Sequence, residues 1–297
     1  MHLTRRTAAV LGAVALACAG CATSDARLTD PSVASSPAAS AAPSGAAGGG
    51  SAQASPSGGA DPTASPVPAA AALPLAGKTV GIDPGHNGGN FDDPGYINSM
   101  IWNGMEEETC DTTGTQTASG YTEAQFNFNV ATDLQTDLIA DGARVVMTRH
   151  SNDGVGPCVT TRAQIINQAH PGVAIDIHAD GGPASGRGFT VLEPVADGPN
   201  DQVISASIAF GGDVRAAMLA DTPMPASDYY GQGGIIERDD LAGLNLTTVP
   251  KILIECGNMP NATDAALLTS PDFQRLLASA LTAAIVAFLT DQPIQTG

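Results

Sequence analysis

The chain has 297 residues, and its 30 acidic and 12 basic side chains give a formal charge of −18 at pH 7. Lys78 and Lys251 are the only lysines. Because binding to phosphate groups depends on Lys and Arg, this balance excludes DNA and RNA as partners. The length alone suggests two domains. However, the first quarter of the chain is too poor in large apolar residues to build a core, so we predict one folded domain over residues 75–292.

Residues 1–21 have the features of an export signal. Two arginines precede Ala8–Ala17, an unbroken run of apolar and small residues. That run is shorter than the ~20 apolar residues that a membrane span requires. The segment Cys18-Ala-Gly-Cys21 resembles a bacterial lipobox, with Cys18 in place of the usual Leu. We therefore expect Cys21 to carry a lipid that anchors the protein in the membrane; ordinary secretion and a twin-arginine signal are the alternatives.

Residues 22–74 form a low-complexity segment made almost wholly of Ala, Ser, Pro, Gly and Thr. Such a composition cannot bury enough apolar surface to offset the entropy lost on ordering, so we predict that it is disordered. A flexible tether of this kind would let an anchored domain sample the space above the membrane. A spacer without further purpose is the alternative.

Strand and helix patterns alternate along residues 75–292. The pattern Thr122-Glu-Ala-Gln125 has the spacing of a capping box and predicts a helix that runs to Asp141. Runs rich in Val and Ile, bounded by turn residues, predict strands. The predicted strands cover Lys78–Asp83, Arg144–Thr148, Val173–His178, Gly188–Glu193 and Lys251–Cys256, and the further helices cover Val159–Ala169, Val203–Leu219 and Pro271–Leu289. This alternation predicts an α/β fold, a single domain with a mostly parallel twisted sheet flanked by helices.

Polar side chains stand where the predicted strands end. His86 follows the first strand, His178 closes the third, and Glu255 ends the last. Glu123 lies in the first turn of the first helix. In open α/β sheets the ligand site lies beyond the carboxyl ends of the strands, so we expect these four side chains to meet there. Two histidines and one carboxylate form an open zinc site, and a second carboxylate is then free to act as a general base.

The spacing by itself also allows structural roles for these residues. A histidine after a turn or at a strand end is more often a structural polar residue than a metal ligand, and a carboxylate inside a fold is usually ion-paired. His150 and His170 have the sequence context of loop residues beside helix ends, and we do not assign them to the site.

Five segments in the same order as in a known family carry a more specific signal. They are Gly81-Ile-Asp-Pro-Gly-His86, Val146-Met-Thr-Arg149 with the later Arg162 and Asn167, Asp176-Ile-His-Ala-Asp180, Arg238-Asp-Asp-Leu-Ala-Gly-Leu244 and Leu253-Ile-Glu-Cys-Gly-Asn-Met-Pro-Asn261. Together they resemble the zinc-dependent N-acetylmuramoyl-L-alanine amidases of type 3, and in particular the short mycobacterial and actinobacterial members. The resemblance extends over residues 78–289.

This resemblance implies a set of roles. It implies that His86, Glu123 and His178 are the zinc ligands and that Glu255 is the catalytic base. The nearby residues Glu106, Glu107 and Glu108 are alternatives to Glu123 as the third zinc ligand. The implied reaction is hydrolysis of the amide bond between N-acetylmuramic acid and L-alanine, in peptidoglycan or in muropeptide fragments, by an exported monomer at the cell envelope. The alternatives are a muropeptide-binding lipoprotein without activity and a zinc peptidase on the same fold.

One departure from the family pattern concerns the residue two positions before His178. The family often has Ser there, whereas this chain has Asp176. Residues two apart on a strand lie on the same face of the sheet. We therefore expect the Asp176 carboxylate to orient His178.

The cysteines fit an exported protein. Cys110 and Cys158 lie in polar, turn-rich sequence. Outside the cytosol such a pair is more often bonded than free, so we predict a disulfide between them. It would fasten a polar insertion, Pro94–Tyr121, to the helix that begins at Val159; loops of this kind can be tied by a disulfide in the short family members. Cys256 follows an apolar strand and is predicted to be a buried thiol.

Overall fold

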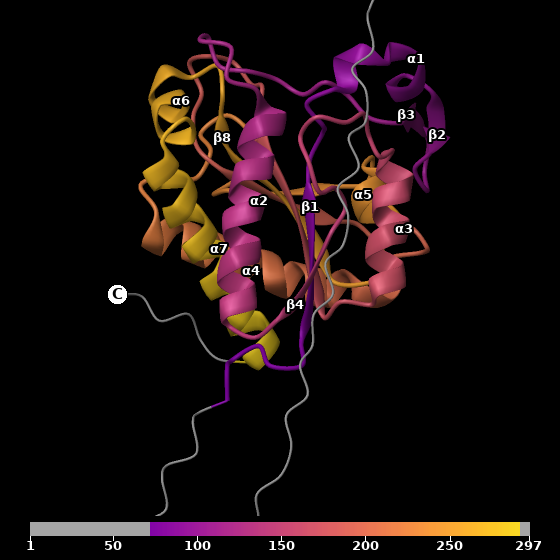
Figure 1. The fold of residues 1–297 in the computed structure, drawn as a ribbon, viewed down its shortest axis with the longest axis vertical. Coiled ribbons are helices and arrows are strands. Elements are labelled where there is room, and N and C mark those ends of the chain that lie inside the picture. Colours follow the sequence, from indigo (N-terminus) through magenta and orange to yellow (C-terminus); the bar gives the residue numbers. More distant parts are fainter. Residues whose placement is uncertain (1–71, 292–297) are drawn as a thin grey trace, which may run out of the picture. The chain divides into compact units, whose positions relative to one another are not determined.

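A six-stranded sheet forms the centre of the folded part of the chain (Figure 1). The computed structural model describes residues 72–291, so the predicted export signal and nearly all of the predicted linker lie outside the described residues. The strand order is β4-β1-β5-β8-β6-β7. The strands are β1 Thr79–Pro84, β4 Arg144–Met147, β5 Val173–Asp180, β6 Thr190–Pro194, β7 Ile235–Arg238 and β8 Lys251–Asn258.

Four neighbouring strands run parallel to one another. β1 pairs in parallel with both β4 and β5, and β5 pairs in parallel with β8. β6 runs antiparallel to β8, and β7 runs parallel to β6. The Val- and Ile-rich sequences of the four parallel strands suit strands that are covered on both faces. The predicted α/β fold with a mostly parallel sheet is therefore confirmed, and the predicted strands are found within one or two residues of their expected bounds.

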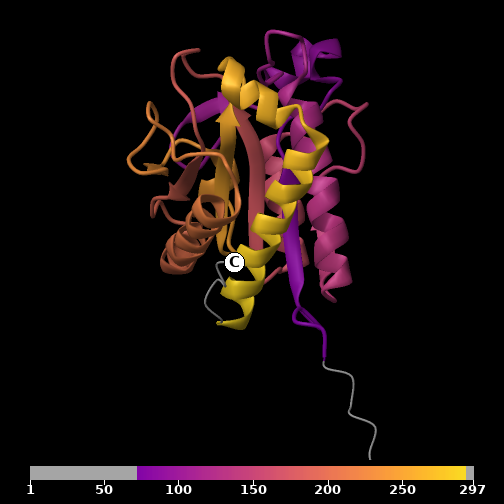
Figure 2. The ribbon, with the colours of Figure 1, turned by 90° about the vertical axis from the view of Figure 1, so that its left-hand side faces the viewer.

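Two helical layers of unequal size cover the sheet. The helices α2 Glu123–Ala140, α4 Ile204–Asp221 and α7 Pro271–Thr290 pack beside one another on one face, with α7 between the other two (Figures 1 and 2). The main apolar core lies between this layer and the sheet. The opposite face carries α3 Val159–Ala169 and the short α5 Ala242–Asn245, with two small apolar clusters. This thinner cover leaves space for charged side chains and for a cavity.

The helices α2 and α7 begin at residues that cap them with their side chains, Thr122 and Ser270. Thr122 is the N-cap of α2 and its side chain accepts the backbone N–H of Gln125 at 3.3 Å. α4 and α7 are long and apolar enough to cross a membrane by length and composition alone, but both pack against this domain. The remaining helical segments are α1 Pro94–Ile97, α6 Ala262–Leu268 and the 3₁₀ turns Asn90–Asp92 and Asp201–Val203.

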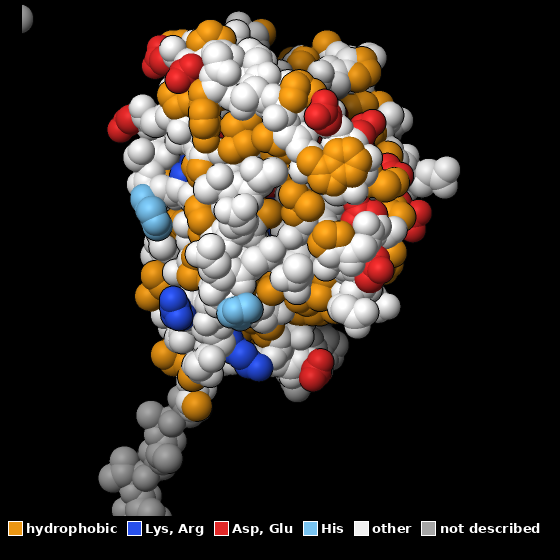
Figure 3. Space-filling view, turned by 90° about the vertical axis from the view of Figure 1, so that its right-hand side faces the viewer, with side chains coloured by type: hydrophobic (Ala, Val, Ile, Leu, Met, Phe, Trp, Pro, Cys, Tyr) orange, Lys and Arg blue, Asp and Glu red, His pale blue; other side chains and the backbone are white. Residues whose placement is uncertain are grey.

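The predicted polar insertion contains a small hairpin, which the sequence patterns did not indicate. Its strands are β2 Met100–Trp102 and β3 Glu107–Thr109. Glu108 Oε1 accepts the N–H of Ala242 at 3.0 Å, which holds the hairpin against the start of α5. Figure 3 shows the side of the molecule that carries the hairpin and α3, where acidic and hydrophobic side chains are common and basic ones are few.

Cys110 and Cys158 come together in the fold. Both are buried free thiols in the structure, and burial together with the neighbouring Cys158 raises the pKa of the Cys110 thiol to about 11. The carbonyl of Cys110 also accepts the N–H of Val159 at 2.8 Å, which joins the insertion to the first residue of α3. The disulfide remains a prediction, whereas the prediction that Cys256 is a buried thiol is confirmed.

Candidate active site

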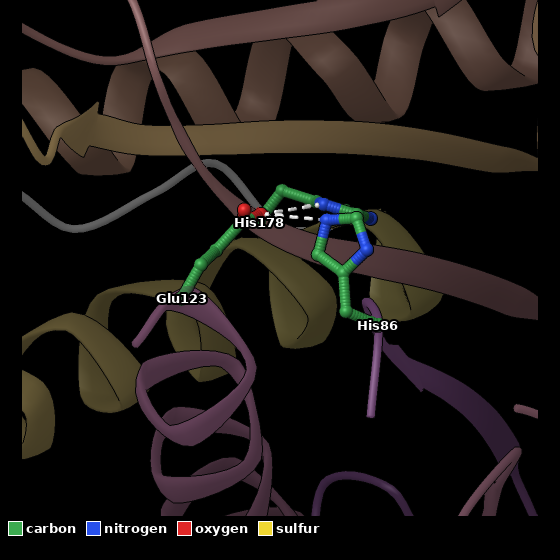
Figure 4. Close-up of side chains that lie close together, drawn as sticks. All are labelled: His86, Glu123 and His178. Atoms are coloured by element: carbon green, nitrogen blue, oxygen red, sulfur yellow. Dashed lines mark hydrogen bonds and ion pairs between the residues drawn. The ribbon is translucent and has the colours of Figure 1, made fainter. Parts of the chain in front are cut away.

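Three predicted site residues converge at the carboxyl edge of the sheet (Figure 4). One potential ligand atom from each of His86, Glu123 and His178 lies within 4.8 Å of the others. Glu123 Oε1 is 2.8 Å from His178 Nδ1 and 3.2 Å from His86 Nε2. They come from three elements: His86 follows β1, Glu123 begins α2, and His178 lies on β5. The spacing suits one metal ion shared by three side chains.

The start of α2 holds the Glu123 carboxylate in place. Glu123 is the first helical residue after the Thr122 cap, where the helix dipole favours a negative charge. Its Oε2 accepts the N–H of Thr115 at 2.9 Å, and the residue is only 4% exposed. These contacts restrict the rotation of the carboxylate and direct its Oε1 toward the two histidines.

Two glycines allow the close approach of these side chains. A Cβ at Gly85 would lie 2.2 Å from the ring of His178. A Cβ at Gly114, which has a φ of +68°, would lie 2.7 Å from both Glu123 Oε2 and the ring of His86. Cβ atoms do not make contacts that short, so any side chain at either position would displace a member of the group.

His86 itself has a left-handed backbone with a φ of 56°, which is unusual for a residue other than glycine. Its carbonyl accepts a hydrogen bond from Arg162 Nη2 at 2.8 Å. Arg162 Nη1 also donates to the carbonyl of Pro84 at 2.7 Å. The buried guanidinium thus holds the turn that directs His86 toward Glu123.

The charges around His86, Glu123 and His178 favour a bound cation. Burial alone would lower the pKa of His86, but the charge of Glu123 and the hydrogen bonds that the ring donates to Asp111 and Glu123 raise it to about 9. Burial likewise opposes the charged form of Glu123, but His86 and His178 hold the pKa of that carboxyl well below its usual range. A buried carboxylate that draws positive charge to itself in this way can exchange protons on the histidines for a metal ion.

Glu255 stands beside this group on β8, where it is the register partner of His178 on β5. Burial, opposed by His178 and reinforced by Glu123 and Asp180, raises the pKa of Glu255 to about 8. Its Oε2 has no hydrogen-bond partner within residues 72–291. A carboxyl group with these properties can take up and release a proton near neutral pH.

We call His86, Glu123 and His178 the metal group. A cavity of about 340 Å³ opens beside it. His86, Glu123, His178 and Glu255 all line it. Its other lining includes Asp180, whose Oδ2 accepts the hydroxyl of Tyr229 at 2.7 Å. The wall also contains apolar and basic residues, among them Leu192, Leu241, Leu253 and Arg238. The four side chains therefore lie together at the carboxyl ends of the strands, as the sequence analysis expected.

The competing residues of the sequence analysis do not belong to the group formed by His86, Glu123 and His178 in residues 72–291. Glu108 lines the cavity but is used to hold the hairpin, and Glu106 and Glu107 do not belong to the metal group found in residues 72–291. His150 is exposed after β4, and His170 is the exposed C-cap of α3. Both are loop residues, as predicted.

Two side chains near the site were not indicated by the sequence patterns. Asp111 Oδ1 hydrogen-bonds His86 Nδ1 at 3.2 Å, and nothing in the sequence of the insertion marks this residue. Lys251 is 1% exposed and pairs with Asp83 and Asp176. A lysine at the start of an apolar strand could have indicated a buried ion pair, because a buried charge requires a partner of opposite charge. Asp176 Oδ1 lies 3.3 Å from His178 Nε2, the contact expected from the sequence.

Comparisons with known proteins identify the family of this chain. The family profile described as N-acetylmuramoyl-L-alanine amidase matches residues 80–287. The N-acetylmuramoyl-L-alanine amidase Rv3717 of Mycobacterium tuberculosis is 39% identical over 225 residues, which are 73% of this chain and 89% of that protein. The crystal structure of the amidase Ami1 from Mycobacterium smegmatis has a TM-score of 0.69 and 39% identity, and covers 73% of this chain and 99% of its own.

The apo crystal structure of Ami1 from Mycobacterium abscessus is similar, with a TM-score of 0.68 and 40% identity over 72% of this chain and 100% of its own. The family match spans most of the chain, and these relatives agree with it in both sequence and fold. The chain therefore belongs to the N-acetylmuramoyl-L-alanine amidase family, and it is a peptidoglycan amidase.

Proposed function

We propose that this amidase works with one zinc ion held by His86, Glu123 and His178, and that Glu255 carries the proton during hydrolysis. The observation that supports this most directly is the convergence of the three donor side chains within 4.8 Å. Two imidazoles and one carboxylate are a donor set that zinc takes in hydrolytic enzymes, with one position left open.

The surroundings of the two histidines fit a metal as well. The nitrogen of each ring that faces away from Glu123 lies against a carboxylate: Asp111 for His86, and Asp176 for His178. Histidines that bind metals nearly always engage their second nitrogen in this way, which fixes the tautomer and the orientation of the ring. The residues present therefore suit the proposed ion.

Bound zinc supplies a Lewis acid that lowers the pKa of a water molecule toward ~7 and polarises the carbonyl of the substrate. Glu255 accepts the proton that the attacking water loses, because its raised pKa and free Oε2 suit it to that step. The oxygen of the water bonds to the lactyl carbonyl carbon of N-acetylmuramic acid, and the bond from that carbon to the nitrogen of L-alanine breaks. Glu255 then delivers its proton to the leaving amine.

A digest of purified cell wall tests the reaction. We expect mass analysis to find intact stem peptides with a free L-alanine amine and glycan strands without peptides. Chelation should abolish this release, and added zinc should restore it. Cut stem peptides would instead indicate a zinc peptidase, and unchanged wall that still binds the protein would indicate a muropeptide-binding lipoprotein.

We further propose that the enzyme is exported and anchored through a lipid on Cys21, with residues 22–74 as the tether and residues 75–292 as a monomeric catalytic domain. This rests on the sequence, because residues 1–71 lie outside the described part of the chain. Fractionation of cells tests it. The wild-type protein should be in the membrane fraction, whereas Cys21→Ala should be absent from it; equal membrane content of the two would exclude the anchor.

A further inference from the structure

Five charged side chains form a continuous chain beneath the metal group. Arg162 Nη2 lies 3.3 Å from Asp111 Oδ2, and Arg162 Nη1 lies 3.1 Å from Asp83 Oδ1. Lys251 Nζ lies 2.8 Å from Asp83 Oδ2 and 3.2 Å from Asp176 Oδ2. Each of these side chains is at most 9% exposed. The order is therefore Asp111–Arg162–Asp83–Lys251–Asp176, and we call this set the ion chain.

The two ends of the ion chain lie against the two histidines of the metal group. Asp111 Oδ1 is 3.2 Å from His86 Nδ1, and Asp176 Oδ1 is 3.3 Å from His178 Nε2. Both ring nitrogens are those that face away from Glu123. A single set of buried charges thus lies behind both rings, on the face of the sheet that α3 and α5 cover.

The Asp176 end depends on Lys251 in a way that the Asp111 end does not. Asp111 is also restrained by the N–H of Thr112, which donates to its Oδ1 at 2.7 Å. Asp176 Oδ1 is buried, has no hydrogen-bond donor within residues 72–291 and lies 3.3 Å from His178 Nε2, whereas Asp176 Oδ2 pairs with Lys251 Nζ. Without the ammonium group, the carboxylates of Asp83 and Asp176 would share a buried space with one cation fewer.

Lys251 is well placed to hold this arrangement. It begins β8 four residues before Glu255, on the same face of the strand, and it is 1% exposed. Its Nζ lies between a carboxylate on β1 and one on β5, so it links three adjacent strands. β8 therefore carries both Glu255, the proposed proton carrier, and Lys251, the cation that pairs with Asp176 behind the ring of His178.

We propose that Lys251 is a positioning residue for the metal site: through Asp176 it holds the ring of His178 in the orientation that binds zinc. This rests on the proposed zinc site. A buried ion pair with a purely structural role would affect the stability of the fold and leave the affinity for metal unchanged. A positioning role affects the affinity for metal and the coordination geometry as well. Changes to residues that support metal ligands typically weaken metal binding by about 10- to 100-fold.

The test compares Lys251→Met with Ile285→Ala, a control that removes part of a fully buried side chain from α7 in the main core. Zinc affinity is measured by competition with a chelator, stability by urea unfolding of the metal-free proteins, and coordination by the visible spectrum of the cobalt-substituted proteins. We expect Lys251→Met to bind zinc about 10- to 100-fold more weakly with an altered cobalt spectrum. Ile285→Ala should lose stability but keep the affinity and spectrum of the wild type.

If Lys251→Met does not fold, the double variant Asp176→Asn with Lys251→Met tests the proposal instead. It removes one negative and one positive charge, so the net buried charge is unchanged. Because Lys251 acts through Asp176, the double variant should bind zinc as weakly as Asp176→Asn alone, within about twofold. Wild-type affinity in folded Lys251→Met or in the double variant would overturn the proposal, as would a further loss of tenfold or more in the double variant over Asp176→Asn. Failure of the wild-type protein itself to bind zinc would instead overturn the zinc site.

Discussion

His178 and Glu255 are direct neighbours across the parallel strands β5 and β8. Neighbouring strands lie ~4.8 Å apart, and paired residues direct their side chains to the same face. The hydrogen bonds of the sheet, rather than a mobile loop, therefore determine the distance between a proposed metal ligand and the proposed proton carrier. Such rigid placement favours catalysis, because small displacements of reacting groups are costly in rate.

Replacement of Glu255 by Gln should separate proton transfer from metal binding. The amide keeps the size of the side chain but cannot accept the proton of water. We expect kcat to fall by about 10²- to 10⁴-fold while one zinc per chain is retained, measured by release of stem peptides and by elemental analysis. Glu237→Gln, an exposed change on β7, should have wild-type activity. Near-normal amide cleavage by Glu255→Gln with zinc bound would show that another group carries the proton.

Replacement of Glu123 by Gln tests this proposed ligand against Glu108, the competing carboxylate in the insertion. Because Glu123 Oε1 faces both histidines, its loss should weaken zinc binding by more than the ~100-fold typical of supporting residues. Glu108→Gln should leave zinc affinity unchanged, since Glu108 holds the hairpin and does not belong to the metal group. Isothermal titration with zinc measures both. The reverse pattern would make Glu108 the ligand.

The Asp83 carboxylate should contribute stability that is lost in acid. Burial alone would raise its pKa, but Lys251 and Arg162 hold the pKa of Asp83 far below 3.8, its ordinary value. A group whose pKa is lowered on folding stabilises the protein above its unfolded pKa, and this contribution disappears as the pH falls toward the folded pKa. The stabilisation is therefore complete at pH 7 and declines below about pH 4.

We expect Asp83→Asn to lower the free energy of unfolding by about 3–5 kcal/mol at pH 7, because it leaves two buried cations with one partner fewer. Urea unfolding of the metal-free proteins at pH 7, 5 and 3 should show this difference shrinking at pH 3. Asp153→Asn, a change at an exposed loop residue, is the matched control and should have no effect at any pH. An equal loss for Asp83→Asn at pH 7 and pH 3 would contradict the assigned pKa shift.

Thiol labelling tests the predicted disulfide. The two thiols are buried, and the hydrogen bond from the N–H of Val159 to the carbonyl of Cys110 places their backbones side by side. A protein that begins after Cys21, unfolded without reductant, should label only at Cys256. Reduction should lower stability by up to ~4 kcal/mol, the chain-entropy value for a closed loop of about fifty residues. Three labelled cysteines would exclude the bond.

Much of the fold can be predicted because its signals are local. The helix Val159–Ala169 has the predicted bounds, and the Thr122 cap places Glu123 at the start of α2. β7 was missed because it is short and only half-buried, with Glu237 and Arg238 at its end, so it lacks the apolar run of the central strands. The hairpin was missed for a related reason, since its strands have three residues each and none of these residues is buried.

The sequence by itself determined the class of fold, the four residues expected at the site and the family, because periodicity, turn residues and ordered motifs are all legible along the chain. Only the tertiary structure decided that β6 runs antiparallel to β8, that His178 faces Glu255, and that Lys251 joins Asp83 to Asp176. Lys251 and Asp83 are 168 positions apart. Which buried charges become partners depends on the order and register of the strands, and these are set by packing of the whole domain rather than by any local segment.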